Sequence, residues 1–117
     1  MSDTSINFTK LEEMKDIMGE VFIQLIPAYL DQSDEMITEM PDLLGKGDLE
    51  TLERHAHSLK SSSLNVGAEA LSAIARELED TTRSNNDDTD ALSAMISAIT
   101  AEYTKVKTEL NNYLQQN

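Results

Sequence analysis

Apolar residues recur at helical spacing through the last part of the chain. The series steps by four and three residues and runs Leu92, Ile96, Ile99, Tyr103, Val106, Leu110, Tyr113. A repeat that averages 3.5 residues keeps one stripe of a helix facing a neighbouring helix, and such helices cross at about 20°. The sequence therefore predicts a long amphipathic helix that packs as in a helical bundle.

The N-terminal part predicts a short helix followed by a long one. Thr9 and Glu12 match a capping-box pattern, so we expect the first helix to run from Thr9 to about Met18. From residue 19 to the Gly45-Lys46-Gly47 segment the apolar positions again step by four and three. Pro27 and Pro41 interrupt this stretch and are expected either to bend one helix or, at Pro27, to break it.

The middle of the chain predicts two further helices and one loop. Asp48 is a good N-cap for a third helix over residues 49–64. A turn at residues 65–67 leads into a fourth helix with Leu71, Ile74 and Leu78 on one face. Residues 83–90 contain no apolar side chain and are expected to form a loop. The predicted fold is all-α: an antiparallel four-helix bundle with a short extra N-terminal helix, in one domain over residues 1–117.

Composition excludes several classes of function. Asp and Glu number 22 against 9 Lys and Arg, a net charge of −13, which disfavours binding to nucleic acid or to an anionic membrane. With no cysteine there is no disulfide, thiolate zinc site or thiol nucleophile. The start lacks a signal-peptide pattern and no apolar run could span a membrane, so we expect a cytoplasmic protein. The apolar stripes suffice for one core, which predicts a monomer.

Residues 54–68 hold both histidines and no carboxylate, in an otherwise acidic chain. On a helix, an inner stripe forms from Leu49, Leu52, Ala56, Leu59 and Ser63. His57 then points outward. It shares the outer face with Glu53, Ser61 and Leu64, and it has Lys60 one turn above and Arg54 one turn below. Because a neutral imidazole has a free ring nitrogen, His57 can act as a nucleophile toward an anionic group.

The motif around His57 resembles that of the histidine phosphotransfer (HPt) domains of multistep two-component phosphorelays. It consists of Ala56-His57-Ser58-Leu59-Lys60 and three serines, followed by Gly67-Ala68 and, further on, by Leu78-Glu79. The resemblance implies that His57 is the phosphorylated histidine and that Lys60 stabilises the phosphoryl charge. Glu79 matches a position that often presents Gln or Glu toward that histidine. Ser61 stands where the family usually has Gly, and its hydroxyl could donate a hydrogen bond to a phosphoryl oxygen.

On this reading the chain is a stand-alone phosphorelay intermediate. It would accept a phosphoryl group on His57 from a receiver-domain aspartate or a hybrid sensor kinase and pass it to another response regulator. The chain has no Walker loop, no glycine-rich ATP segment and no acidic cluster for Mg²⁺. We therefore expect a phosphoryl carrier without a kinase or ATP site and without its own cofactor, with Mg²⁺ on the partner. Arg54, Glu53 and Leu64 are the candidate partner-binding residues.

Other readings stay open at this point. His57 could be an exposed helix histidine with no role, and the chain a non-catalytic helical adaptor. His55 is expected to be a structural, partly buried histidine. Two histidines at i and i+2 point about 200° apart and cannot bind one metal within a helix, and the Glu-x-x-His pair of di-iron bundles is missing. Leu64 either belongs to a docking patch or contacts the edge of the core.

Overall fold

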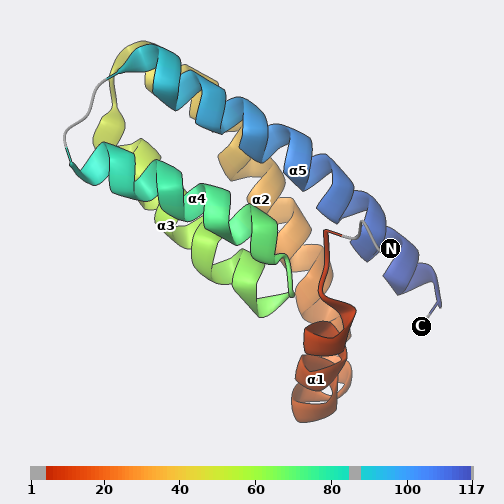
Figure 1. Ribbon diagram of the computed structural model, residues 1–117. Helices are drawn as coiled ribbons and strands as arrows, with labels where there is room; N and C mark the ends of the chain where they lie inside the picture. The colour runs from red at the N-terminus through yellow and green to blue at the C-terminus, as the bar shows by residue number, and fades with distance from the viewer. Residues whose placement is uncertain (1–4, 85–87, 117) are drawn as a thin grey trace.

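The computed structural model describes residues 5–84 and 88–116, and within them it contains five helices and no strand. They are α1 (Phe8–Met18), α2 (Glu20–Lys46), α3 (Leu49–Asn65), α4 (Glu69–Arg83) and α5 (Thr89–Gln116). α2 packs on α3, α3 on α4, α4 on α5 and α5 on α2, while α1 contacts α2 near one end of the bundle (Figure 1). Because successive helices run in opposite directions, the predicted antiparallel four-helix bundle with an extra N-terminal helix is confirmed.

The repeat in α5 supplies one wall of the core. All seven of its apolar positions are buried, and they are Leu92, Ile96, Ile99, Tyr103, Val106, Leu110 and Tyr113. α3 contributes Leu52, Ala56 and Leu59, which have no exposed surface, together with the equally buried Ser63. Among the described residues, none of the helices is long and apolar enough to cross a membrane.

α2 is one continuous helix through both prolines. Pro27 and Pro41 lie on its exposed side, whereas Phe22, Ile26 and Met40 are buried. A proline removes one backbone hydrogen bond, and on the solvent side water can satisfy the carbonyl that is left over. The expectation of one helix is confirmed, and the alternative break at Pro27 is wrong.

The caps agree with the prediction at α3 and differ at α1. The side chain of Asp48 accepts a hydrogen bond from the Thr51 amide at 3.1 Å, as expected. At α1 the capping box of Thr9 and Glu12 is wrong. The helix already includes Phe8, and its N-cap is Asn7, whose side chain accepts from the Lys10 amide at 3.2 Å. Asn7 satisfies the same orphan amides two residues earlier.

The predicted loop over residues 83–90 is longer than the real one. Arg83 is the last residue of α4, and Thr89 and Asp90 open α5. Residues 85–87, the centre of the predicted loop, lie outside the described residues. The side chain of Asp88 accepts hydrogen bonds from the amides of Asp90 and Ala91. The polar residues at the end of the predicted loop therefore cap and begin α5.

The turn between α3 and α4 is tied to the segment before α1. The Asn7 amide donates to the Gly67 carbonyl at 2.8 Å, and Gly67 has a φ of +79°. A Cβ at Gly67 would lie 2.8 Å from the Asn7 carbonyl oxygen. The predicted turn role of Gly67 is confirmed, since only glycine combines this φ with so close a neighbouring backbone.

Candidate functional site

His57 lies on the outer face of α3, opposite the stripe that enters the core. Its side chain is 58% exposed. The Nδ1 atom lies 2.6 Å from Oε2 of Glu79, and within the described residues Nε2 has no hydrogen-bond partner. The predicted outward orientation is confirmed, and one ring nitrogen is left available to a partner molecule.

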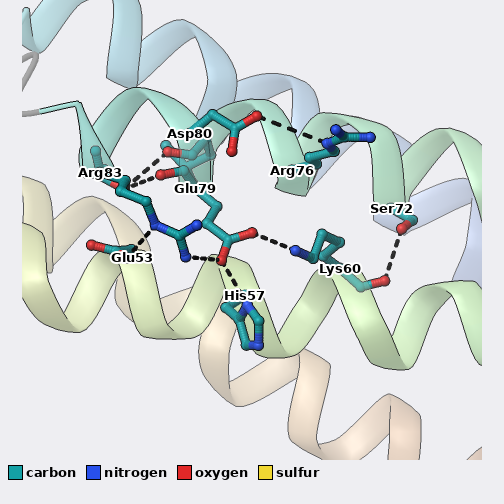
Figure 2. A network of polar contacts seen from close by, with 10 residues as sticks. Glu53, His57, Lys60, Ser72, Arg76, Glu79, Asp80 and Arg83 are labelled. Carbon is teal, nitrogen blue, oxygen red and sulfur yellow. Dashed lines mark hydrogen bonds and ion pairs between the residues drawn. The ribbon is translucent and has the colours of Figure 1, made fainter.

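Glu79 is the centre of the site. It lies on the face of α4 that packs against α3, and its side chain is only 1% exposed. Oε1 accepts from Nζ of Lys60 at 2.6 Å, and Oε2 contacts Nδ1 of His57 at 2.6 Å and Nη2 of Arg83 at 2.7 Å. Figure 2 shows the carboxylate between the lysine on one side and the histidine and arginine on the other. A buried charge therefore has a partner at each of its oxygens.

These contacts keep Glu79 ionised. Burial by itself raises the pKa of the Glu79 carboxyl, but the hydrogen bonds from Lys60 and then His57, with their charges, hold the pKa below its ordinary value. An ionised carboxylate only accepts hydrogen bonds, so Nδ1 of His57 must carry the proton that it shares with Oε2. In the neutral imidazole, the lone pair is then on the exposed Nε2.

Lys60 lies one turn after His57, as expected, but its ammonium group is held by Glu79. The side chain is 29% exposed. The Lys60 carbonyl accepts from the Ser72 hydroxyl at 2.8 Å, a second polar link between α3 and α4. The lysine thus both neutralises the buried carboxylate and adds positive charge next to the imidazole.

Arg83 is the residue that the sequence analysis missed, because it was assigned to a loop. Its Nη2 donates to Glu79, and its Nε donates to Oε2 of Glu53 on α3 at 3.2 Å. The hydrogen bond to Glu53 and the charge of Glu79 raise the pKa of the guanidinium, so Arg83 stays cationic. Glu79 and Arg83 are four residues apart, and this i,i+4 spacing was the signal that could have placed the arginine at the site.

The structure places the other candidates with mixed outcomes. Arg54 donates to the Thr51 hydroxyl at 3.1 Å, and the second cation that contacts Glu79 is Arg83. The partner-binding role of Arg54 stays a prediction. Ser61 is exposed and makes no side-chain hydrogen bond within the described residues. Leu64 is 44% exposed rather than part of the core. His55 is partly buried and contacts Glu39 on α2 at 2.7 Å, which confirms its structural reading.

The arrangement supports nucleophilic chemistry at Nε2 with electrostatic help from two cations. Across residues 5–84 and 88–116 no cluster of three or more His, Cys, Asp or Glu side chains is arranged to hold a metal ion. A carboxylate fixes the tautomer, and a rigid two-helix contact fixes the direction of the ring. Such a site is suited to accept a group from a partner.

Comparisons with known proteins point to one family. The Hpt domain family model matches residues 24–116. Histidine-containing phosphotransfer protein B (HptB) from Pseudomonas aeruginosa PAO1 is 24% identical, with a TM-score of 0.90 and 99% of each chain covered. A rice protein provisionally named a histidine-containing phosphotransfer protein is 19% identical, with a TM-score of 0.76 over 92% of this chain and 76% of that one. At these identities the two structures show a shared fold. A search of curated proteins gave no significant match.

Proposed function

The chain belongs to the Hpt domain family, and we propose that His57 is the residue on which it carries the phosphoryl group. Hpt proteins are phosphotransfer carriers and not kinases, and they interact with receiver domains and kinases in phosphorelays. The chain is accordingly a phosphorelay intermediate. The observation that carries the assignment to His57 is the contact of its Nδ1 with buried Glu79, which leaves Nε2 as the exposed nucleophile.

The proposed transfer proceeds in two reversible steps. The Nε2 lone pair attacks the phosphorus of an aspartyl phosphate on a receiver domain, the P–N bond forms, and the acyl P–O bond breaks. The aspartate leaves with the electron pair of that bond. The Nδ1 proton stays on the ring, which becomes a phosphorylated imidazolium, and the Glu79 carboxylate that accepts this proton offsets the positive charge of the ring. A second receiver's aspartate then takes the group in the reverse direction.

Positioning and charge account for most of what a protein contributes to phosphoryl transfer. Glu79 orients the ring, and Lys60 and Arg83 place two cations around it. Ser61 lies one turn after His57 on the same exposed face, where its hydroxyl can donate to a phosphoryl oxygen. We propose that the chain supplies no ATP site and no cofactor, and that Mg²⁺ is bound by the receiver.

A receiver also needs a surface on which to dock. Ile17, Leu25 and Leu64 are large exposed apolar residues, and Ile17 is 80% exposed. Ile17 and Leu64 line one shallow groove, and Leu25 lines a second groove beside it. Met14 and Asn65 line both grooves, so the two are continuous. Leu64 lies two helical turns after His57 on the same face of α3. We propose that these three residues, the apolar patch, bind the receiver beside the phosphorylated histidine as a 1:1 complex with a monomer.

The assignment of His57 is tested by phosphorylation with phosphoramidate and with a phosphorylated receiver domain. The wild-type chain should gain one acid-labile, base-stable phosphoryl group, and His57→Ala should gain none. His55→Ala is the matched control and should label as the wild type does. Label that survives in His57→Ala, or that disappears only in His55→Ala, refutes the assignment. The absence of any label on the folded wild type would favour the non-catalytic adaptor.

Lys60→Ala and the patch variants separate chemistry from docking. Lys60→Ala should slow labelling by either donor and leave the helical circular dichroism unchanged. Ile17→Asp and Leu64→Asp should slow labelling by the receiver and leave labelling by phosphoramidate at the wild-type rate. Equal slowing with both donors would mean that the patch variants disturb the site itself and that the patch is not a docking surface.

A further inference from the structure

Arg83 is shared between two carboxylates that differ greatly in their surroundings. Its contact with Glu79 is 2.7 Å long and reaches a side chain that is almost completely buried, whereas its contact with Glu53 is 3.2 Å long and lies at the surface. The arginine side chain is 61% exposed. Glu53 could be rehydrated if the arginine moved away, but Glu79 could not. The bond to Glu53 is the one that Arg83 can give up.

The guanidinium also lies close to the reactive ring. Nη2 of Arg83 and Nδ1 of His57 contact the same oxygen of Glu79, at 2.7 and 2.6 Å. The two nitrogens are therefore no farther apart than these distances combined. Figure 2 shows the guanidinium reaching from α4 past Glu79 toward Glu53, on the side of the carboxylate where His57 lies. Because the arginine side chain is exposed, it is free to turn away from Glu53 toward a group attached to Nε2 of the same ring.

Charge in the unphosphorylated site is already balanced. Glu53 and Glu79 carry two negative charges, and Lys60 and Arg83 carry two positive charges. A phosphoryl group would add almost two negative charges at neutral pH. Arg54, one turn before His57, donates to the Thr51 hydroxyl and, within the described residues, takes no part in the ion pairs around Glu79. Of the two cations that contact Glu79, Lys60 is bound to the buried carboxylate alone, so the one that the new anion can recruit more readily is Arg83, taken from Glu53.

We infer that Glu53 and the phosphoryl group on His57 compete for Arg83, so that Glu53 weakens the hold of the site on its phosphoryl group. This inference rests on the proposed phosphorylation of His57. A carrier must release what it accepts. In the unphosphorylated chain Glu53 bonds to Arg83, and this bond lowers the free energy of that state relative to the phosphorylated one. Release of the phosphoryl group is thereby favoured: an aspartate oxygen of the receiver bonds to the phosphorus, the P–N bond breaks, and its electron pair returns to Nε2.

The experiment measures the interaction of Arg83 with the phosphoryl group directly. The chain is phosphorylated with phosphoramidate, and the proton affinity of the phosphoryl group is measured from the pH dependence of its ³¹P resonance. Glu53→Gln should lower that affinity about two- to five-fold, the range expected when a surface ion pair no longer competes. In the wild type, the Nε–H resonance of Arg83 should move on phosphorylation as its bond to Glu53 is lost.

Two further variants separate the inference from simpler explanations. Glu50→Gln removes an exposed carboxylate from the same helix outside the network and controls for net charge. In an Arg83→Gln background, the effect of Glu53→Gln should vanish. An equal effect in both backgrounds would mean direct repulsion between Glu53 and the phosphoryl group. That result, or no effect beyond Glu50→Gln, overturns the inference while phosphorylation at His57 stands. Failure of the wild type to label at His57 instead overturns the proposed function.

Discussion

Replacement of Glu79 by glutamine is the most direct perturbation of the site. It keeps the shape of the side chain and removes the charge that Lys60, His57 and Arg83 share. Glutamine has one acceptor oxygen. If that oxygen takes the place of Oε1, it keeps Lys60 and turns its NH₂ group toward His57 and Arg83. If it takes the place of Oε2, it turns the NH₂ group toward the lysine. At least one of Lys60 and Arg83 therefore loses its hydrogen bond to residue 79 in either orientation.

The expected loss of stability follows from the burial of the three partners. A hydrogen bond to a charged group contributes about 1.5–3 kcal/mol, and three such bonds converge on Glu79. His57 and Arg83 are more than half exposed and can be rehydrated, and glutamine keeps part of the network. We expect Glu79→Gln to lower the free energy of unfolding by about 1–3 kcal/mol at pH 7.5. The melting temperature should fall by about 4 °C for each kcal/mol.

The same substitution should make the loss of stability depend on pH. The pKa of Glu79 in the folded chain lies below its ordinary value of 4.5. Its contribution to stability is therefore fully present well above pH 4.5 and is lost as the pH falls through the folded-state pKa. The difference in unfolding free energy between the wild type and Glu79→Gln should be constant at neutral pH and shrink in acid.

Urea unfolding followed by circular dichroism at 222 nm measures this difference between pH 7.5 and 4. Protein concentrations should be low, because the isoelectric point of about 4.3 favours association in acid. Glu77→Gln is the matched control, since Glu77 is exposed on the same helix, and its stability should stay within about 0.5 kcal/mol of the wild type. A Glu79→Gln variant as stable as the control at pH 7.5, or a difference that does not shrink in acid, would refute the reasoning.

Two further predictions concern the scaffold. Gly67→Ala should destabilise the chain by about 1–3 kcal/mol, because the φ of Gly67 is +79° and a Cβ there would meet the Asn7 carbonyl. Gly45→Ala lies in open space on α2 and should stabilise the chain by about 0.5–1 kcal/mol. Equal effects of the two substitutions in thermal melts would contradict this account. Tyr29→Phe should cost about 1–2 kcal/mol because it leaves the buried Ser63 hydroxyl unpaired, and adding Ser63→Ala should recover part of that loss; additive losses in urea unfolding would argue against the bond.

The sequence by itself determined the helices and the outward direction of His57. Periodicity alone placed the α5 stripe, the inner stripe of α3 and the bundle class, because burial in a helix repeats with a fixed angle per residue. For α2 the same rule left a bent helix and a break at Pro27 both possible, and the structure shows one helix with both prolines on its exposed side. Local end signals were less decisive. Asp48 and Asn7 are chemically equally good N-caps, but Asn7 was missed because Thr9 and Glu12 matched the capping-box pattern two residues later.

The resemblance indicated Lys60 and Glu79 as neighbours of the histidine, and only the tertiary structure decided how these groups contact one another and that Arg83 joins them. Glu79 lies 22 positions after His57, and Arg83 lies 30 positions after Glu53. No local pattern in the chain states which residues of α3 they contact. Their pairing depends on the offset and rotation at which α3 packs on α4, which the whole core sets together. The nucleophilic histidine can be identified from a few neighbouring residues in the sequence. The network of charged side chains that orients it and would stabilise a phosphoryl group forms only when α3 and α4 have packed together.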